Sequence, residues 1–295
     1  MNRSANIPPD LVGILNVNKA SGWTSHDVVA RVRRLAGQKR VGHAGTLDPM
    51  AQGVLPVLLG RATRLADCVQ QGRKTYEADI TLGIATDTDD AEGQTVAEQP
   101  VPRLEPADIL HAFEQFRGEI LQTPPAYSAL KVNGQRAYAV ARRGGDVQLA
   151  ARPVSIEDLQ LLAFDENRLT LRVTCSRGTY VRALARDLAR ALGTVGHMSR
   201  LVRTRVGPFG LEDAVTLPAL ADAGLSSALL TPDRALPDAP TITVDAAAIA
   251  RLAMGQTVTA PADLASDAVW VYDPDGHVVC LGRAGGGVLH VGITL

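Results

Sequence analysis

The sequence predicts an α+β fold. Two runs, residues 76–82 and 169–175, alternate apolar and polar side chains with the period of strands that bury one face. A third run, residues 181–192, repeats its apolar side chains with the period of a helix. The chain has 295 residues, of which 46% are hydrophobic. Its length suggests one large domain with a substantial core and one small domain.

An early helix is expected to begin at Thr24, because residues 24–27, Thr-Ser-His-Asp, have the form of a helix start. The apolar residues that follow share one helical face, and three arginines lie largely outside it. The apolar residues are Val28, Val32, Leu35 and Ala36, and the arginines are Arg31, Arg33 and Arg34. This helix should therefore expose basic side chains.

The helix predicted at residues 181–192 follows a strand and a punctuating glycine, Gly178. Its apolar stripe consists of Val181, Leu184, Ala185, Leu188 and Leu192. Arg182, Arg186 and Arg190 recur four apart on another face. By position alone, these are solvated arginines on a helix surface.

Two further segments indicate how the chain is organised. Residues 122–153 combine prolines and glycines with Lys and Arg, which predicts a basic, partly irregular excursion. Residues 236–240 have the composition of a linker. Beyond it, residues 245–254 are helix-like, and residues 269–272 and 278–281 flank a turn as a hairpin. We expect one domain at residues 1–236 and a second, small and β-rich, at residues 237–295.

The formal net charge of −1 is distributed unevenly. Residues 1–75 carry 11 Lys and Arg against 4 Asp and Glu, and residues 121–210 carry 14 against 6. The intervening residues 76–120 carry 2 against 11, and residues 211–295 carry 3 against 10. A basic face could then meet phosphates while the acidic segments point elsewhere, as in a selective nucleic-acid-binding protein. The alternative is a solvated surface of mixed charge.

Several other classes of protein are disfavoured. Residues 1–10 have no apolar signal segment and no apolar stretch is long enough to span a bilayer, so a cytoplasmic location is expected. The three cysteines lack any C-x-x-C pair, which favours buried, reduced thiols over a disulfide or a zinc site. The acidic run at residues 87–93 has its glycine in the seventh place, not the sixth of an EF-hand, and is interpreted as a turn between strands.

The densest candidate for chemistry is residues 40–56. Its glycines and prolines fix an irregular backbone, which suits a loop that holds His43 and Asp48 in set positions. The simpler interpretation is that Asp48-Pro49 only opens a turn.

Residues 40–48, continued by residues 53–57 and 60–64, closely resemble the catalytic motif of the TruB family, the tRNA pseudouridine-55 synthases. Three further blocks resemble the family's other signatures, in the family's order. They are residues 74–78 with 82–83 and 86–89, residues 125–131, and residues 178–182 leading through His197 and Leu201 to residues 203–204. The resemblance extends from Gly13 to Phe209. Ala20 and Ala189 depart from it, standing where a proline and a glycine are frequent.

The resemblance implies a pseudouridine-synthase-type fold, a mixed, mostly antiparallel sheet with flanking helices, plus a small β-rich, PUA-like domain at residues 237–295. It also implies isomerisation of uridine 55 in the tRNA T-loop, by base flipping and without cofactor or metal. Asp48 matches the family's catalytic aspartate, which can attack C6 of the base or C1′ of the ribose. The sequence does not choose between these carbons.

The same resemblance implies roles for other residues. Arg182 matches the arginine partner of the aspartate, and a guanidinium there would keep the carboxylate ionised. Tyr76 matches the aromatic residue that stacks on the target uracil, although periodicity alone makes it a half-buried strand tyrosine. The remaining substrate-binding candidates are His43, which would refill the space of the extruded base, Tyr180 and Leu201 as pocket walls, and Lys19, Lys131 and Arg142. Lys131 and Arg142 lie in residues 122–153, which are placed like the family's RNA-clamping loop. His197 is assigned a structural role.

The expected partner is tRNA, bound at its T-loop and elbow by a monomer with no membrane contact and no obligatory protein partner. The first alternative is an RNA chaperone that refolds tRNA without needing catalysis. A second is a guide-RNA-dependent enzyme within a larger complex, against which the absence of a long basic tail argues. A third, a glycoside-type hydrolase, would normally need a second carboxylate, and the matched motifs offer none.

Overall fold

The computed structural model describes residues 11–295, apart from residues 129, 133–134, 138–139, 141–142, 144 and 146. Contacts divide the chain into two compact units. The first contains the described residues up to Asp48, then Val54–Gln70 and Gly207–Leu295, and the second contains Pro49–Gly53 and Gln71–Val206. The chain therefore passes from one unit to the other directly after Asp48.

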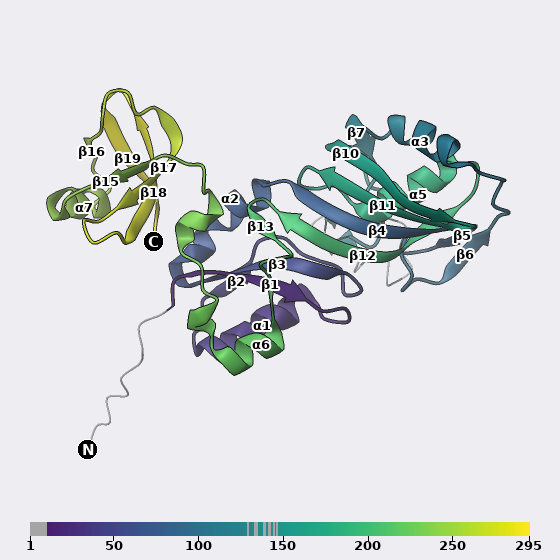
Figure 1. Cartoon of the computed structure of the whole chain (residues 1–295), viewed down its shortest axis with the longest axis horizontal. Coiled ribbons are helices and arrows are strands. Elements are labelled where there is room, and N and C mark those ends of the chain that lie inside the picture. Colours follow the sequence, from purple (N-terminus) through teal and green to yellow (C-terminus); the bar gives the residue numbers. More distant parts are fainter. Residues whose placement is uncertain are drawn as a thin grey trace, which may run out of the picture. The chain divides into compact units, whose positions relative to one another are not determined.

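The main part of the first unit combines helices with a small sheet. Its elements are β1 (Gly13–Lys19), α1 (Ser25–Ala36), β2 (Val41–His43), β3 (Gln52–Leu59), the 3-10 helix η1 (Gly60–Leu65), α2 (Ala66–Gln71), β13 (Phe209–Gly210), β14 (Val215–Thr216), α6 (Leu217–Ala223), η2 (Leu225–Ser227) and η3 (Pro232–Ala235). The strand order is β14-β1-β3, with β2 antiparallel to β3 and β14 parallel to β1. Helices α1 and α6 lie side by side (Figure 1).

Helix α1 begins where the sequence predicts. The Thr24 hydroxyl accepts a hydrogen bond from the Asp27 amide at 3.1 Å, and the Asp27 carboxylate accepts one from the Thr24 amide at 2.9 Å. This reciprocal pair is a capping box, which satisfies amides that have no partner within the helix. The helix buries Val28, Val29 and Val32, while Arg33 and Arg34 are exposed, as expected.

The second unit is built on a five-stranded antiparallel sheet in the order β12-β4-β11-β10-β7. Its elements are β4 (Lys74–Leu82), β5 (Ile84–Thr86), β6 (Thr95–Glu98), α3 (Pro106–Glu114), β7 (Gly118–Gln122), β8 (Lys131–Val132), β9 (Gln135–Arg136), β10 (Arg152–Asp165), β11 (Arg168–Cys175), α5 (Val181–Ala191) and β12 (Gly196–Val206). The first two residues of β3 pair in parallel with β12. Helices α3 and α5 contact each other and strands of this sheet (Figure 1).

The secondary structure predicted for this unit is confirmed. Strand β4 buries every second residue along its length, and β11 does the same from Leu169 to Cys175. Helix α5 buries Val181, Leu184 and Leu188. Residues 87–94 connect the antiparallel strands β5 and β6, so the acidic run is a turn between strands.

Residues 241–294 of the first unit form a separate five-stranded sheet. It contains β15 (Thr241–Thr243), α7 (Ala246–Ala253), β16 (Val258–Thr259), β17 (Ser266–Tyr272), β18 (Val278–Gly285) and β19 (Val288–Thr294), with strand order β15-β17-β18-β19-β16. Its own hydrophobic cluster includes Val269, Val271 and Leu289, all fully buried. The predicted hairpin is formed by β17 and β18. The domain boundary at residues 236 and 237 stays a prediction.

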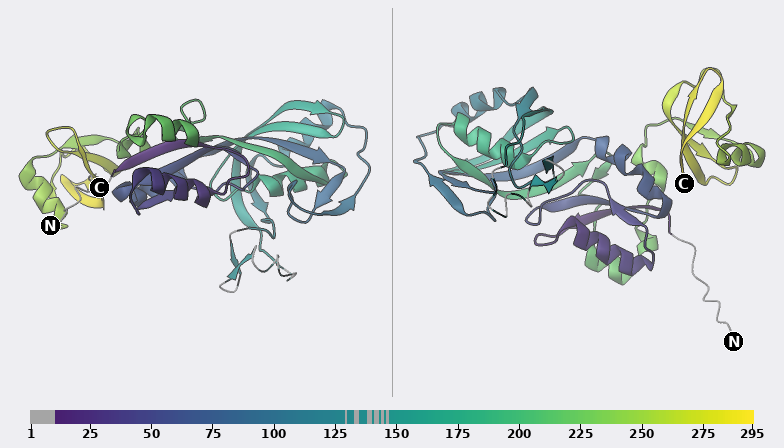
Figure 2. Two further views of the ribbon diagram at one scale, coloured as in Figure 1. Left: turned by 90° about the horizontal axis from the view of Figure 1, so that it is seen from below. Right: turned by 180° about the vertical axis from the view of Figure 1, so that it is seen from behind.

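The predicted RNA-clamping insertion, residues 122–153, is described only in part. Strands β8 and β9 within it make a two-stranded sheet that stands away from the main sheet of the second unit (Figure 2). Arg142 lies outside the described residues. Lys131 is in β8, and the structure describes its backbone only.

The cysteines are free thiols: Cys175 and Cys280 are buried and Cys68 is half-buried. Burial raises the pKa of Cys175 and of Cys280 to about 11, which keeps both protonated at neutral pH. Within the described part of the chain, each helix is too short or too polar to cross a bilayer.

A glycine in β3 provides a test of the fold. Gly53 has a φ of +100°, and a Cβ there would collide with the backbone of Arg203 in the paired strand β12. We expect Gly53→Ala to lower the free energy of unfolding by at least about 2 kcal/mol, through backbone strain and this clash. Thermal unfolding should show a Tm lower by roughly 5 °C or more.

Gly42→Ala is the matched control. A Cβ at Gly42 would have Thr63 as its nearest neighbour, at an ordinary contact distance of 3.8 Å. Its Tm should stay within about 2 °C of that of the unaltered protein, as for most tolerated substitutions. Equal Tm values for the two variants would contradict this account of Gly53.

Candidate active site

The loop between β2 and β3 carries Asp48 and follows His43, the last residue of β2, and hydrogen bonds hold its backbone at several points. His43 is paired with Val57 in the β2–β3 ladder, and the Ala44 amide donates to the Pro56 carbonyl at 2.9 Å. Gly45, with a φ of +110°, then turns the chain in a conformation that glycine adopts without strain. Asp48 follows, half-buried. The loop thus presents a carboxylate from an ordered irregular backbone.

The first turn of α1 contacts this loop twice. The Ser25 hydroxyl accepts a hydrogen bond from the Leu47 amide at 2.9 Å and donates one to the Leu47 carbonyl at 3.2 Å. The rings of His26 and His43 meet edge to face, with centroids 5.9 Å apart. Hydrogen bonds therefore join the loop between β2 and β3 to the start of α1, although Ser25 and Leu47 are 22 positions apart in the sequence.

Lys19, a predicted substrate contact, is fully buried. Its ammonium group donates to the carbonyls of Ala20 at 3.0 Å and Trp23 at 2.6 Å, so it holds the turn that leads into α1. The structure gives Lys19 this local role, and its contact with substrate stays a prediction.

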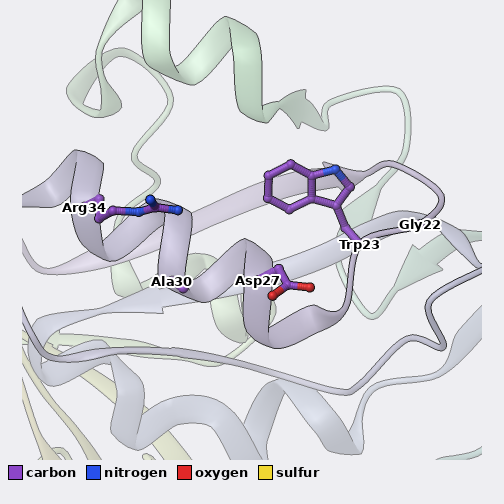
Figure 3. Close-up of a pocket in the computed structure, with 5 residues that line it drawn as sticks. All are labelled: Gly22, Trp23, Asp27, Ala30 and Arg34. Atoms are coloured by element: carbon purple, nitrogen blue, oxygen red, sulfur yellow. The ribbon is translucent and has the colours of Figure 1, made fainter.

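A shallow hollow of about 320 Å³ lies beside the start of α1, lined by Gly22, Trp23, Asp27, Ala30 and Arg34 (Figure 3). None of the residues proposed above for catalysis lines it. Trp23 is 38% exposed, and a carboxylate, of Asp27, and a guanidinium, of Arg34, also line the hollow.

In the second unit, two predicted residues share one face of the sheet. Leu201 of β12 is paired with Ala78 of β4, and Tyr76 stands two residues before Ala78. Paired residues and residues two apart along a strand point to the same face, so Tyr76 and Leu201 do as well. Tyr76 is 9% exposed and Leu201 is 6% exposed. Arg203, which is paired with Tyr76 across the two strands, points to the same face and is 2% exposed. The roles of Tyr76 and Leu201 toward a base stay predictions.

Arg182 is buried, in contrast to the solvated arginine that its position alone indicates. It is 6% exposed, and its guanidinium donates to the carbonyls of Thr88 and Tyr127, both at 3.0 Å. One of its nitrogens also lies 3.3 Å from a carboxylate oxygen of Asp90, which is itself 4% exposed. A buried guanidinium with fixed partners can present positive charge without rearranging.

Gln122 holds the backbone at the start of α5. Its side-chain amide accepts from the Tyr180 amide at 2.8 Å and donates to the Tyr180 carbonyl at 3.1 Å. Gln122 is 2% exposed, and it fixes the chain two residues before Arg182. No role is predicted for Gln122 from the sequence, because an isolated glutamine has no recognisable pattern.

Two arginines of α5, Arg182 and Arg186, bind carboxylates of the acidic turn between β5 and β6. Asp89 adopts a left-handed conformation, with a φ of 60°, that aspartate tolerates. Its carboxylate accepts from Arg186 at 2.8 Å, next to the pair made by Asp90 and Arg182. Burial raises the pKa of Asp89 even though the Arg186 charge opposes the increase.

This arrangement corrects the expectation that the acidic segments point away from the basic ones. In strands β4, β11 and β12 as well, Glu77 binds Arg172 at 2.8 Å and Asp79 lies 3.8 Å from Arg200. The acidic block at residues 76–120 therefore neutralises part of the second basic block. For the pairs of Asp89 and Asp90 with α5, the recurrence of arginines four apart and the acidic run were the sequence features that could have indicated them.

Two other candidates have local explanations. The His197 ring donates from Nδ1 to the Ile84 carbonyl at 2.8 Å, in agreement with a structural role. Ligand atoms of Asp273, Asp275 and His277 lie within 4.8 Å of one another in the β17–β18 turn. Asp273 accepts hydrogen bonds from the His277 amide and ring, which explains this cluster as a hairpin turn.

Comparisons with known proteins point to one family. A model described as TruB family pseudouridylate synthase (N terminal domain) matches residues 33–181, and one described as tRNA pseudouridylate synthase B C-terminal domain matches residues 182–234. The chain is 43% identical to the tRNA pseudouridine synthase B of Heliobacterium modesticaldum over 267 residues, covering 90% of this chain and 87% of that protein. It is 50% identical to the protein of the same name from Symbiobacterium thermophilum over 246 residues, covering 82% of each.

Solved structures agree on the fold. The chain is similar to a chain of the crystal structure of a Cbf5-Nop10-Gar1 complex, with a TM-score of 0.71, 28% identity, and coverage of 93% of this chain and 78% of that one. It is also similar to a chain of an H/ACA RNP bound to a substrate RNA containing 2′-deoxyuridine, with a TM-score of 0.72, 24% identity, and coverage of 99% and 92%. The second likeness shows the fold alone.

The buried pair of Asp90 and Arg182 predicts a large effect on stability. Asp90→Ala leaves a buried guanidinium without its carboxylate, and we expect the free energy of unfolding to decrease by about 3 kcal/mol or more. Urea denaturation measures it. The control is Asp87→Ala in the same turn, an exposed residue whose loss should cost about 1 kcal/mol or less. A loss for Asp90→Ala no greater than that of the control would show that the pair does not stabilise the fold.

Lys74, at the start of β4, predicts a pH dependence. Burial, with a smaller contribution from Arg203, lowers the pKa of Lys74 from 10.5 to about 8. The unfolded chain then binds more protons than the folded one between these values, so this group makes stability increase with pH across that window. Relative to Lys74→Met, the unaltered protein should gain on the order of 1 kcal/mol between pH 7.5 and 10. Unfolding curves of both proteins at each pH would reveal a constant difference if the pKa is ordinary.

Proposed function

The chain belongs to the TruB family of pseudouridylate synthases, and we propose that it isomerises uridine 55 in the T-loop of tRNA to pseudouridine, as a standalone enzyme. The observation that carries this proposal is the match of the family model to residues 33–181, which include both Asp48 and Tyr76. The relatives named tRNA pseudouridine synthase B support tRNA as the substrate, because the chain covers more than four fifths of two of them.

The reaction needs bond exchange and no redox change. The N1–C1′ bond of the uridine breaks, the base turns, and a C5–C1′ bond forms. C5 loses its proton to a base or to solvent and N1 takes up a proton, so no atom is gained or lost overall. A carboxylate nucleophile can form a covalent intermediate, through C6 or C1′, that divides this exchange into two easier steps. We assign the role to Asp48. The ordered backbone of the β2–β3 loop supports this assignment, because a nucleophile gains rate by being held in position.

Arg182 is the proposed electrostatic partner of Asp48. A guanidinium near a carboxylate favours its ionised form, which is the nucleophilic one. The burial of Arg182 and its bonds to Thr88, Tyr127 and Asp90 support such a role, since they fix the direction of the guanidinium. The Asp90 carboxylate partly neutralises the positive charge of Arg182, so it would also weaken the effect of Arg182 on the ionisation of Asp48.

Tyr76, Tyr180 and Leu201 are the proposed walls of the base pocket. A base within a folded T-loop must leave its stack before it can react, at a cost of a few kcal/mol, and aromatic stacking offsets part of that cost. His43 is proposed to fill the vacated space in the RNA. Its half-buried position, packed on His26 at the end of β2, supports a ring held ready for insertion.

The guide-dependent alternative has one observation in its favour. The similar structure of a Cbf5-Nop10-Gar1 complex is, by its description, an assembly with other proteins. Its identity of 28% is well below the 43% and 50% of the two relatives named for tRNA, which favours standalone action. The chaperone alternative shares the tRNA substrate and differs only in whether chemistry is needed.

The central test incubates an unmodified tRNA transcript with the purified protein, without guide RNA, metal or nucleotide, and maps pseudouridine. We expect product at the T-loop uridine, and for Asp48→Asn a rate at least about 10⁴-fold lower, because an amide cannot replace the nucleophile. Asp67→Asn changes an exposed acid of α2 and should keep full activity.

Each contrary outcome has a separate meaning. No product despite tight tRNA binding would exclude standalone action and favour the guide-dependent or chaperone alternatives. Product at another uridine would correct the site of modification alone. Equal rates for Asp48→Asn and the unaltered protein would exclude Asp48 as the nucleophile.

A further inference from the structure

We propose that Ser25 is a positioning residue for the reaction, because its hydroxyl fixes the peptide that precedes Asp48. The proposal rests on the proposed function of Asp48. Ser25 acts through the Leu47 backbone and need not touch the RNA.

Ser25 holds Leu47 by two hydrogen bonds, and we call this pair of bonds the clamp. Ser25 is 1% exposed and Leu47 is 4% exposed, so water does not compete for their polar groups. A serine hydroxyl has one proton to donate and can accept as well, and here it does both toward a single residue. It accepts from the Leu47 amide at 2.9 Å and donates to the Leu47 carbonyl at 3.2 Å. Both polar groups of that residue in an irregular loop are thereby satisfied.

The serine of the clamp belongs to a well-packed helix, α1. Ser25 is the first residue of α1, directly after the cap made by Thr24 and Asp27, and the helix is anchored by three buried valines. A site residue supported by a helix is held more accurately than one supported by its own loop. The position of the Leu47 peptide is therefore set by the helix.

The Ser25 contact acts on the residue directly before Asp48. On the His43 side, the ladder pairing and the bond from Ala44 to Pro56 end before Gly45. Gly45 has a φ of +110°, which glycine adopts without strain, and the two hydrogen bonds of Ser25 hold the chain between Gly45 and Asp48. A displacement of about 1 Å at a reacting group can cost on the order of 100-fold in rate. Loss of the clamp should therefore be felt in the chemical step.

The test compares Ser25→Ala with Thr24→Ala. Both alter the start of α1, but Thr24→Ala removes the exposed cap and leaves the clamp in place. With tRNA transcript as substrate, we expect kcat for Ser25→Ala to decrease roughly 10- to 100-fold, while the Kd for tRNA changes by less than about twofold. For Thr24→Ala we expect a lower Tm with kcat within about twofold of the unaltered protein.

The results separate positioning from stability. A kcat for Ser25→Ala within twofold of the unaltered value would overturn the proposal, and so would an equal loss for Thr24→Ala. If Ser25→Ala does not fold, Ser25→Cys fills the same space with a weaker donor and acceptor. It should then lower kcat with little change in Tm, and an unchanged kcat would again overturn the proposal.

Asp48→Asn is assayed in parallel. If that variant is as active as the unaltered protein, the proposed role of Asp48 has failed, and any effect of Ser25 has another cause. If Asp48→Asn is inactive and Ser25→Ala is fully active, only the positioning role has failed.

Discussion

The constraint on which the site depends is that buried peptide groups of an irregular loop must find hydrogen-bond partners. Residues 44–51, the loop between β2 and β3 that includes Asp48, form no strand ladder. Partners of its peptide groups include the Pro56 carbonyl of a strand and the hydroxyl of Ser25, the first residue of a helix. Because these partners belong to well-packed elements, a loop without regular structure has a defined conformation.

In the second unit, too, a buried polar side chain binds the backbone groups of a segment outside the strand ladders. Gln122, at the end of β7, bonds both backbone groups of Tyr180 and so fixes the start of α5. Arg182 then enters the interior, where the turn between β5 and β6 supplies Asp90 and the Thr88 carbonyl, and the segment after β7 supplies the Tyr127 carbonyl. In both units a single buried polar side chain orders the backbone next to a residue proposed for chemistry.

Many charged side chains of the second unit form ion pairs with one another. The acidic residues of β4 and of the β5–β6 turn bind arginines of β11, β12 and α5. This pairing reduces the positive charge that the second basic block can offer to phosphates. Exposed Arg33 and Arg34 of α1 remain available in the first block. A count of basic residues in the sequence therefore overestimates the positive charge of the folded surface. The opposite charges of a close ion pair largely cancel when they act on a distant group.

The sequence by itself determined the elements with strong periodicity, β4, β11, α1 and α5, because a buried face imposes its repeat on the residues. It also determined the family, because the motif around Asp48 and the blocks near Tyr76 and Arg182 are specific. Only the tertiary structure decided that Arg182 is buried against Asp90, that Lys19 holds a turn, and that Ser25 and Gln122 fasten the backbone. These contacts join residues between 4 and 92 positions apart, and a lone serine or glutamine carries no local pattern. Their partners are set by how the chain folds back on itself, which local periodicity does not encode.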